Sequence, residues 1–153
     1  MSPVPTFPSA AAAMATVRAG LRFLAAADVT QMPVQTQSEC LRMLEQTDAI
    51  STAARISILG AFTAGQGYSA DADYSSRAWL INRTQITKGA AVAHTAWVRR
   101  AAAHPQIAQA LVEGEISESF ARTLCQWTDK LPADSRDAAD TILVSAAGAG
   151  MDL

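Results

Sequence analysis

Cysteine and histidine are scarce in this chain, and their scarcity excludes several kinds of site. The chain has two cysteines, Cys40 and Cys125, and two histidines, His94 and His104. Two cysteines without a CxxC spacing cannot form a zinc site or a disulfide framework, so a reducing, cytoplasmic setting is expected. On one helix the two histidines would lie about three turns apart, too far to bind one metal ion. The sequence therefore predicts no metal site and no cofactor.

Long apolar runs are also missing. The alanine-rich stretch from Ala10 to Ala27 contains Arg18 and Arg22, and no Lys or Arg precedes it, unlike a secretory signal peptide. No other run approaches the roughly 20 apolar residues of a membrane-spanning helix. We therefore expect a soluble protein without membrane partners.

Complete sets of catalytic residues are absent as well. Glu113, Glu115 and Glu118 lie close together, but such a cluster is more typical of a solvated helix junction than of a catalytic carboxylate pair. Each histidine is interpreted as a surface or helix-cap residue. With no paired nucleophile and base and no metal cluster, we expect this chain to have no catalytic site.

What the chain does have is a helix-forming composition. Hydrophobic residues make up 50% of the chain and charged residues only 17%, as in globular proteins, and many of the apolar residues are alanine. Residues 1–8 are proline-rich and are predicted to be a disordered lead-in, and residues 9–153 a single helical domain. No segment alternates with period two, so the predicted fold class is all-α, a compact bundle of about six or seven helices.

Capping signals predict the helix boundaries. A first helix is expected from near Ser9 to about Asp28. Thr36-Gln37-Ser38-Glu39 has the form of a capping box, so a long second helix is expected to start there and to reach Ala64. The polar segment from Tyr68 to Ser76 is predicted to be a loop.

The second half of the chain contains further boundary signals. Pro105 suits the first position of a helix, Gly114 a C-cap and Ser117 an N-cap. In the helix after Ser117, apolar residues recur at i, i+4, i+7 and i+11, which predicts one buried stripe. Its members are Phe120, Leu124, Trp127 and Leu131. Core packing is also predicted for Trp97.

The charges are unevenly distributed. All 14 acidic residues fall outside the segment from Tyr74 to Val112, which leaves about +5 inside this segment and −7 in the rest of the chain. A local excess of positive charge is typical of surfaces that meet nucleic acid. The five basic residues of this segment are Arg77, Arg83, Lys88, Arg99 and Arg100.

The same segment contains a pattern that resembles a helix-turn-helix, from Leu80 to Ala93. Ile86 takes the place of the apolar turn anchor and Thr87 that of the residue that caps the recognition helix. Gln85 stands where such motifs usually have a turn glycine. An ordinary helical hairpin with a solvated basic face is the alternative interpretation.

The helix expected at residues 88–102 would have two different faces. Ala90, Ala93 and Trp97 are predicted to pack inward with Ile86, whereas Ala91 and Val92 are placed on the outer face, where they cannot hydrogen-bond base edges. The basic outer face would meet DNA phosphates instead. The candidate DNA-contacting residues are Arg83, Thr87, Lys88, Thr95, Arg99 and Arg100.

A combination of short motifs from about residue 36 to the C-terminus resembles a known bacterial family. The most distinctive piece is Ala-Leu-x-x-Gly-x-Ile-Ser at residues 110–117. The other pieces are Trp79-Leu80, Thr87 with Ala91 and Ala96, His104-Pro105, Ala121, Leu131-Pro132, Leu143-Val144 and Ala146-Ala147. In this combination the chain is similar to the domain of unknown function 222, also called the thirteen-E-twelve repeat family.

This resemblance implies a helical domain with a DNA-linked role, usually followed by an HNH endonuclease domain. The sequence contains neither a His-Asn-His constellation nor zinc-type cysteine pairs. We therefore expect a non-catalytic DNA-associated domain, the N-terminal part of an HNH-endonuclease-like protein, whether as a fragment, a truncated product or a degenerate copy. The alternative is a structural or oligomerisation module that packs on another copy or on the missing C-terminal domain and binds no nucleic acid.

Overall fold

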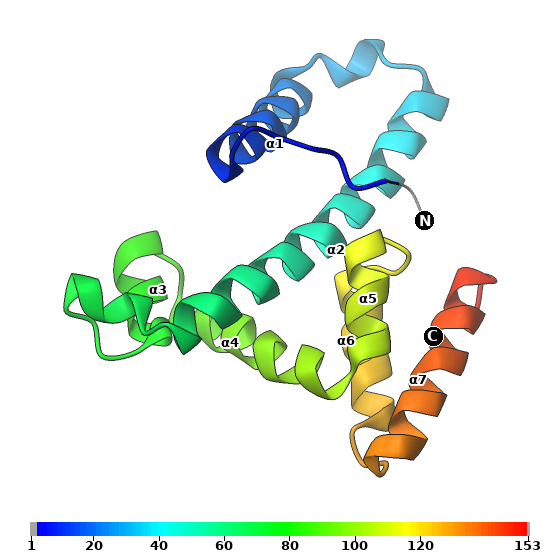
Figure 1. Cartoon of the computed structure of the whole chain (residues 1–153). Coiled ribbons are helices and arrows are strands. Elements are labelled where there is room, and N and C mark those ends of the chain that lie inside the picture. Colours follow the sequence, from blue (N-terminus) through cyan, green and yellow to red (C-terminus); the bar gives the residue numbers. More distant parts are fainter. Residues whose placement is uncertain (1–2, 153) are drawn as a thin grey trace. The chain divides into compact units, whose positions relative to one another are not determined.

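The computed structural model describes residues 3–152, and within them the chain forms α-helices and short 3-10 helices but no strand (Figure 1). The all-α prediction is confirmed. The elements are α1 (Ala10–Ala26), η1 (Val29–Gln31), α2 (Val34–Ala64), η2 (Gly67–Asp71), α3 (Ser76–Thr84), α4 (Lys88–Ala103), α5 (Pro105–Glu113), α6 (Glu118–Thr128) and α7 (Ala133–Gly148).

The contacts divide the described chain into two units, one ending at Arg42 and the other beginning at Met43, within α2. Of the predicted lead-in, residues 1–2 lie outside the described residues, and residues 3–8 form no helix or strand. A search of residues 3–152 for a helix with both the length and the apolar character needed to cross a membrane found none.

The first unit shows one correct and one wrong helix boundary. As predicted, α1 begins after Ser9, whose hydroxyl accepts a hydrogen bond from the Ala12 amide at 3.1 Å. The capping box predicted at Thr36–Glu39 is wrong, because α2 already begins at Val34. The Gln37 amide donates to the Pro33 carbonyl at 3.0 Å, so Thr36 lies inside the first helical turn and cannot be its cap.

In the second unit, α5, α6 and α7 pack on one another, and α4 packs on α5 (Figure 1). Ile107 and Leu111 of α5 and Leu124 of α6 are completely buried in the core between these helices. Ala49 of α2 and Trp97 of α4 belong to the same cluster. Burial of each large aliphatic side chain stabilises the fold by about 1.5–3 kcal/mol.

The predicted caps of this unit are confirmed. The hydroxyls of Thr87 and Ser117 accept hydrogen bonds from the amides of Ala90 and Phe120, each at 3.2 Å. Pro105 is the first residue of α5. Gly114 ends α5 with a φ of 67°, a conformation that favours glycine, and an added Cβ would come within 3.2 Å of Ile50.

The buried stripe predicted for α6 is only partly correct. Leu124 is buried, but Trp127 is 52% exposed and Leu131 is 37% exposed. The helix ends at Thr128, so Leu131 lies beyond its last turn. The buried residues of α6 recur at i, i+3, i+4 and i+7 and define the inward face. This face consists of Ala121, Leu124, Cys125 and Thr128.

The segment predicted as a loop from Tyr68 to Ser76 is partly helical, because η2 occupies its first half. It is held against α3 by Trp79, whose indole N–H donates to the Asp71 carboxylate at 2.7 Å. The indole also packs on Phe62, with ring centroids 4.7 Å apart. Trp79 is therefore a structural residue that anchors this turn.

Candidate functional site

The segment that resembles a helix-turn-helix consists of α3, a three-residue turn and α4. Gln85 takes the left-handed conformation, with a φ of 58°, that a turn glycine would adopt. Thr87 caps α4 as predicted. The local geometry therefore fits the predicted motif, although a helical hairpin without DNA contact has the same elements.

The inward face of α4 differs from the prediction at two positions. Ala91 is completely buried, whereas Ala93, predicted to pack inward, is exposed. Trp97 is buried as predicted, and Val92 is exposed. Alanine occurs on several sides of this helix, so its spacing did not identify the face that packs.

Lys88, Thr95 and Arg99 lie on one side of α4 and line a groove of about 490 Å³. Arg77 of α3 lines the same groove, and its guanidinium donates to the Thr95 hydroxyl at 3.4 Å. Leu59 of α2 contributes an apolar wall. The groove is thus formed by α2, α3 and α4, and its cations come from two of these helices.

The described lining of the groove has a net positive charge. Its lining within the described chain includes Arg77, Lys88 and Arg99 but no acidic residue. The ion pairs formed by the described residues involve other side chains. Such a concave cationic surface attracts anions.

Three of the six predicted contact residues have other roles. Arg83 donates to the Asp71 carbonyl at 2.8 Å and lies 3.5 Å from the Asp73 carboxylate. Arg100 lies over the Trp97 ring, with its guanidinium carbon 4.7 Å from the ring centroid. The Thr87 hydroxyl caps α4. These residues do not line the groove.

Two lining residues, Tyr74 and Arg77, were not among the predicted contacts. Both belong to the segment without acidic residues, which was the available signal. They were missed because the helix-turn-helix pattern begins only at Leu80. Tyr74 and Arg77 flank the pair Ser75-Ser76. The Ser75 hydroxyl accepts a hydrogen bond from the Ala78 amide at 3.1 Å and caps α3.

A second groove, of about 370 Å³, is lined by α2, α4 and the start of α6 and has a different charge. Glu45, Asp48 and Glu118 outnumber Arg55 in its lining. Burial, and to a smaller extent the charge of Arg55, lowers the pKa of His94 in this groove, so the imidazole is neutral at pH 7. Among the described residues, no group of His, Cys, Asp and Glu has the arrangement of a metal site.

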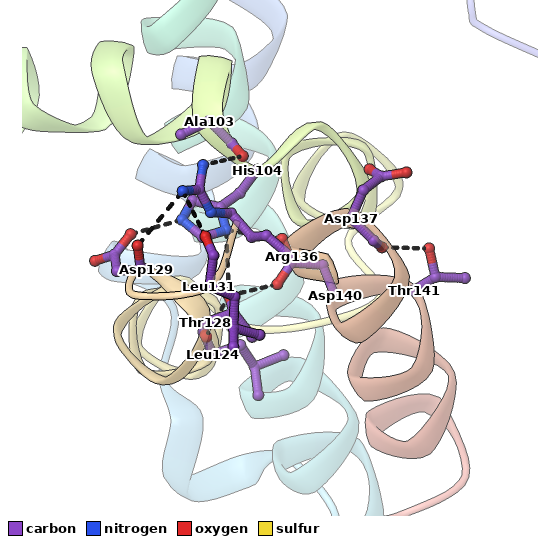
Figure 2. A network of polar contacts seen from close by, with 10 residues as sticks. All are labelled: Ala103, His104, Leu124, Thr128, Asp129, Leu131, Arg136, Asp137, Asp140 and Thr141. Carbon is purple, nitrogen blue, oxygen red and sulfur yellow. Dashed lines mark hydrogen bonds and ion pairs between the residues drawn. The ribbon is translucent and has the colours of Figure 1, made fainter. Parts of the chain in front are cut away.

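His104 is the centre of a buried polar network (Figure 2). Its interpretation as a surface residue is wrong, because it has no exposed surface, although it does occupy the cap position between α4 and α5. Its Nδ1 lies 2.7 Å from an Asp140 oxygen and its Nε2 lies 2.7 Å from an Asp129 oxygen. Thr128 donates to the other Asp140 oxygen at 2.6 Å.

This network has a structural role. Both ring nitrogens of His104 are occupied by carboxylates, so neither is available to exchange a proton with a substrate. The network connects the α4–α5 junction with the end of α6 and with α7 (Figure 2). Arg136 extends it by donating to the Leu131 carbonyl at 3.0 Å and to the Ala103 carbonyl at 3.5 Å.

Comparisons with protein-family models, with curated proteins and with solved structures found no match. The resemblance of residues 36–153 to the domain of unknown function 222 stays a prediction, as does the HNH endonuclease domain that it implies.

Proposed function

We propose that this chain is a non-catalytic helical domain that associates with DNA through the phosphate backbone, as the N-terminal part of an HNH-endonuclease-like protein. The observation that supports the proposal is the groove with Arg77, Lys88 and Arg99 and no acidic residue in its described lining. Phosphate oxygens accept about half or more of the hydrogen bonds in protein–DNA interfaces, and Lys and Arg are frequent donors. The groove therefore has the chemistry of a backbone contact.

The expected binding is weak and independent of base sequence. Val92, on the exposed part of α4, has no group that hydrogen-bonds a base edge. With about three phosphate contacts, the dissociation constant at physiological salt is expected near 10⁻⁴ to 10⁻⁶ M. Its logarithmic salt dependence is expected to have a slope of roughly −3 on duplex DNA.

Replacing Lys88 and Arg99 together with alanine is expected to weaken binding to all DNA sequences alike. The loss of two phosphate contacts should flatten the salt slope by about 2. Fluorescence anisotropy with labelled duplexes of two unrelated sequences, titrated at several salt concentrations, measures both effects.

The matched control is the double change Arg18→Ala and Arg22→Ala in α1, which removes the same charge from outside the groove. It is expected to weaken binding much less. The proposal is wrong if the wild-type protein binds no DNA at low salt, or if both double variants lose the same affinity.

A second function, that of an oligomerisation module, is supported by α1. None of its residues, all of which the structure describes, is buried, and Met14, Val17, Leu21 and Phe23 are exposed. Met14, Val17 and Leu21 follow one another at i, i+3 and i+7 and so share one side of α1. An exposed apolar stripe of this kind is typical of a protein interface, here with a second copy of the chain. Light scattering at micromolar concentrations would detect a dimer, and a purely monomeric protein would exclude this candidate.

A further inference from the structure

Tyr74 places an uncovered aromatic ring beside the cationic groove. The residue contributes to the groove lining, yet it is 87% exposed. It immediately precedes Ser75, the N-cap of α3, whose hydrogen bond to the Ala78 amide fixes the backbone at this point. The ring is therefore attached to an ordered backbone and is free to contact a ligand in the groove.

The shape of the groove favours a single strand over a duplex. Lys88 and Arg99 do not project from an isolated helix, because α2 contributes Leu59 and α3 contributes Arg77 to the walls around them. Direct recognition of a duplex requires an element that enters the major groove, which is about 12 Å wide. A flexible single strand can instead follow the concave surface between the helices.

The lining also contains apolar surface for the uncharged parts of a nucleotide. Leu59, Ala78 and Val98 lie among the cations, so the groove offers contacts to a sugar or a base edge as well as to a phosphate. Proteins that bind single strands without sequence preference combine such a cationic track with aromatic side chains on which bases stack. The groove and Tyr74 together have both parts of this combination.

We propose that the groove binds an unpaired segment of single-stranded DNA, with its backbone phosphates held by Arg77, Lys88 and Arg99 and one base stacked on Tyr74. This inference rests on the proposed DNA association and specifies the form of DNA. Every base has a π-face that can stack on the ring, so all four bases are accepted. The preference for single strands comes from the shape of the groove together with the ring, and the charge-dependent part of the affinity comes from the cations.

The test compares a labelled single strand of about 15 thymidines with a duplex of the same length by anisotropy at low salt. The wild-type protein is expected to bind the single strand several-fold more tightly. Tyr74→Ala should weaken single-strand binding roughly 5- to 150-fold, the range measured for loss of one stacked base, and change duplex binding less than about twofold. Tyr74→Phe keeps the ring and should retain the affinity.

Phe23→Ala is the matched control, because Phe23 is an exposed aromatic residue that does not line the groove. Unchanged single-strand affinity in Tyr74→Ala, with loss in the Lys88 and Arg99 double variant, would overturn this inference and leave the proposed function standing. Equal or tighter binding of the duplex would also overturn it. Absence of binding to either form would overturn both, and tighter binding of an oligouridine than of the oligothymidine would overturn the assignment to DNA.

Discussion

The imidazole of His104 lies between two carboxylates that differ in exposure. Asp140 is completely buried, whereas the Asp129 side chain is 53% exposed. Each ring nitrogen faces one of these carboxylates at 2.7 Å. Burying a carboxylate without hydrogen-bond partners lowers the stability of the folded protein. The contact between His104 and Asp140 is therefore more important for stability than the contact with Asp129.

His104→Ala is expected to lower the free energy of unfolding by roughly 3–5 kcal/mol, because it leaves Asp140 buried without its main partner. Asp129→Ala is the matched control, since it removes the other carboxylate of the same histidine from an exposed position. It should cost less, about 1–3 kcal/mol, because only the ring Nε2 loses its partner and Asp140 keeps its own. Urea unfolding followed by circular dichroism measures the free energy of unfolding of both variants. Equal losses in the two variants would contradict the greater importance of the contact with Asp140.

The two cysteines are expected to differ in reactivity. Burial raises the pKa of the Cys125 thiol to about 12, so it stays protonated and shielded in the folded protein at pH 8. Cys40 is partly exposed. Titration with a chromogenic disulfide is expected to show one rapidly reacting thiol in the folded protein and a second only after unfolding. Cys40→Ser should remove the rapid phase, and its persistence would contradict the prediction.

The same raised pKa has a consequence for stability at alkaline pH. The folded protein holds the Cys125 proton more tightly than the unfolded chain, whose thiols titrate near their ordinary value of 9.0. The contribution of this group to stability is therefore complete below about pH 9 and is lost as the pH rises towards 12.

Sequence patterns identified residues whose roles are local and missed those whose roles depend on distant partners. The caps Thr87 and Ser117 bond amides three positions away, so they can be recognised from sequence alone. The partners of His104 lie 25 and 36 positions away in the chain. No spacing rule connects positions so far apart, so the buried network could not be predicted.

Among the elements, the turn between α3 and α4 contains a strained position. Gln85 has a φ of 58°, a conformation that costs a residue with a Cβ roughly 1–2 kcal/mol. Glycine adopts this conformation without that cost, although it also increases the entropy of the unfolded chain.

Gln85→Gly is therefore expected to raise the free energy of unfolding by up to about 1 kcal/mol. Gln126→Gly, in the exposed interior of α6, is the matched control and should lower it by about 1 kcal/mol. Thermal unfolding compares the two. A loss of stability in Gln85→Gly would show that the turn is not held in the left-handed conformation.

Helix faces were harder to predict than helix ends. In α4 the buried position is Ala91 rather than Ala93, and in α6 it is Cys125 rather than Trp127. Both errors are two positions in size. They arise because alanine provides little contrast between faces and a large aromatic residue is not always buried. The start of α2 was missed for another reason, since its first hydrogen bond uses the Pro33 carbonyl and no capping side chain.

At the scale of the whole chain, the distribution of charge predicted more of the candidate site than the motif did. The segment without acidic residues contains Tyr74, Arg77, Lys88 and Arg99, all of which line the groove. The motif placed Lys88 and Arg99 correctly on one side of α4. The groove itself could not be predicted, because its walls come from three helices whose packing no local pattern specifies.

The closed set of contacts around His104 also limits how this sequence can change over generations. Asp140 hydrogen-bonds His104 through one carboxylate oxygen and Thr128 through the other. Loss of any one of these three side chains leaves a buried polar atom without a partner. Single substitutions are therefore disfavoured at all three positions. Among descendants of this chain, we expect these residues to be kept together or to be exchanged together for apolar side chains.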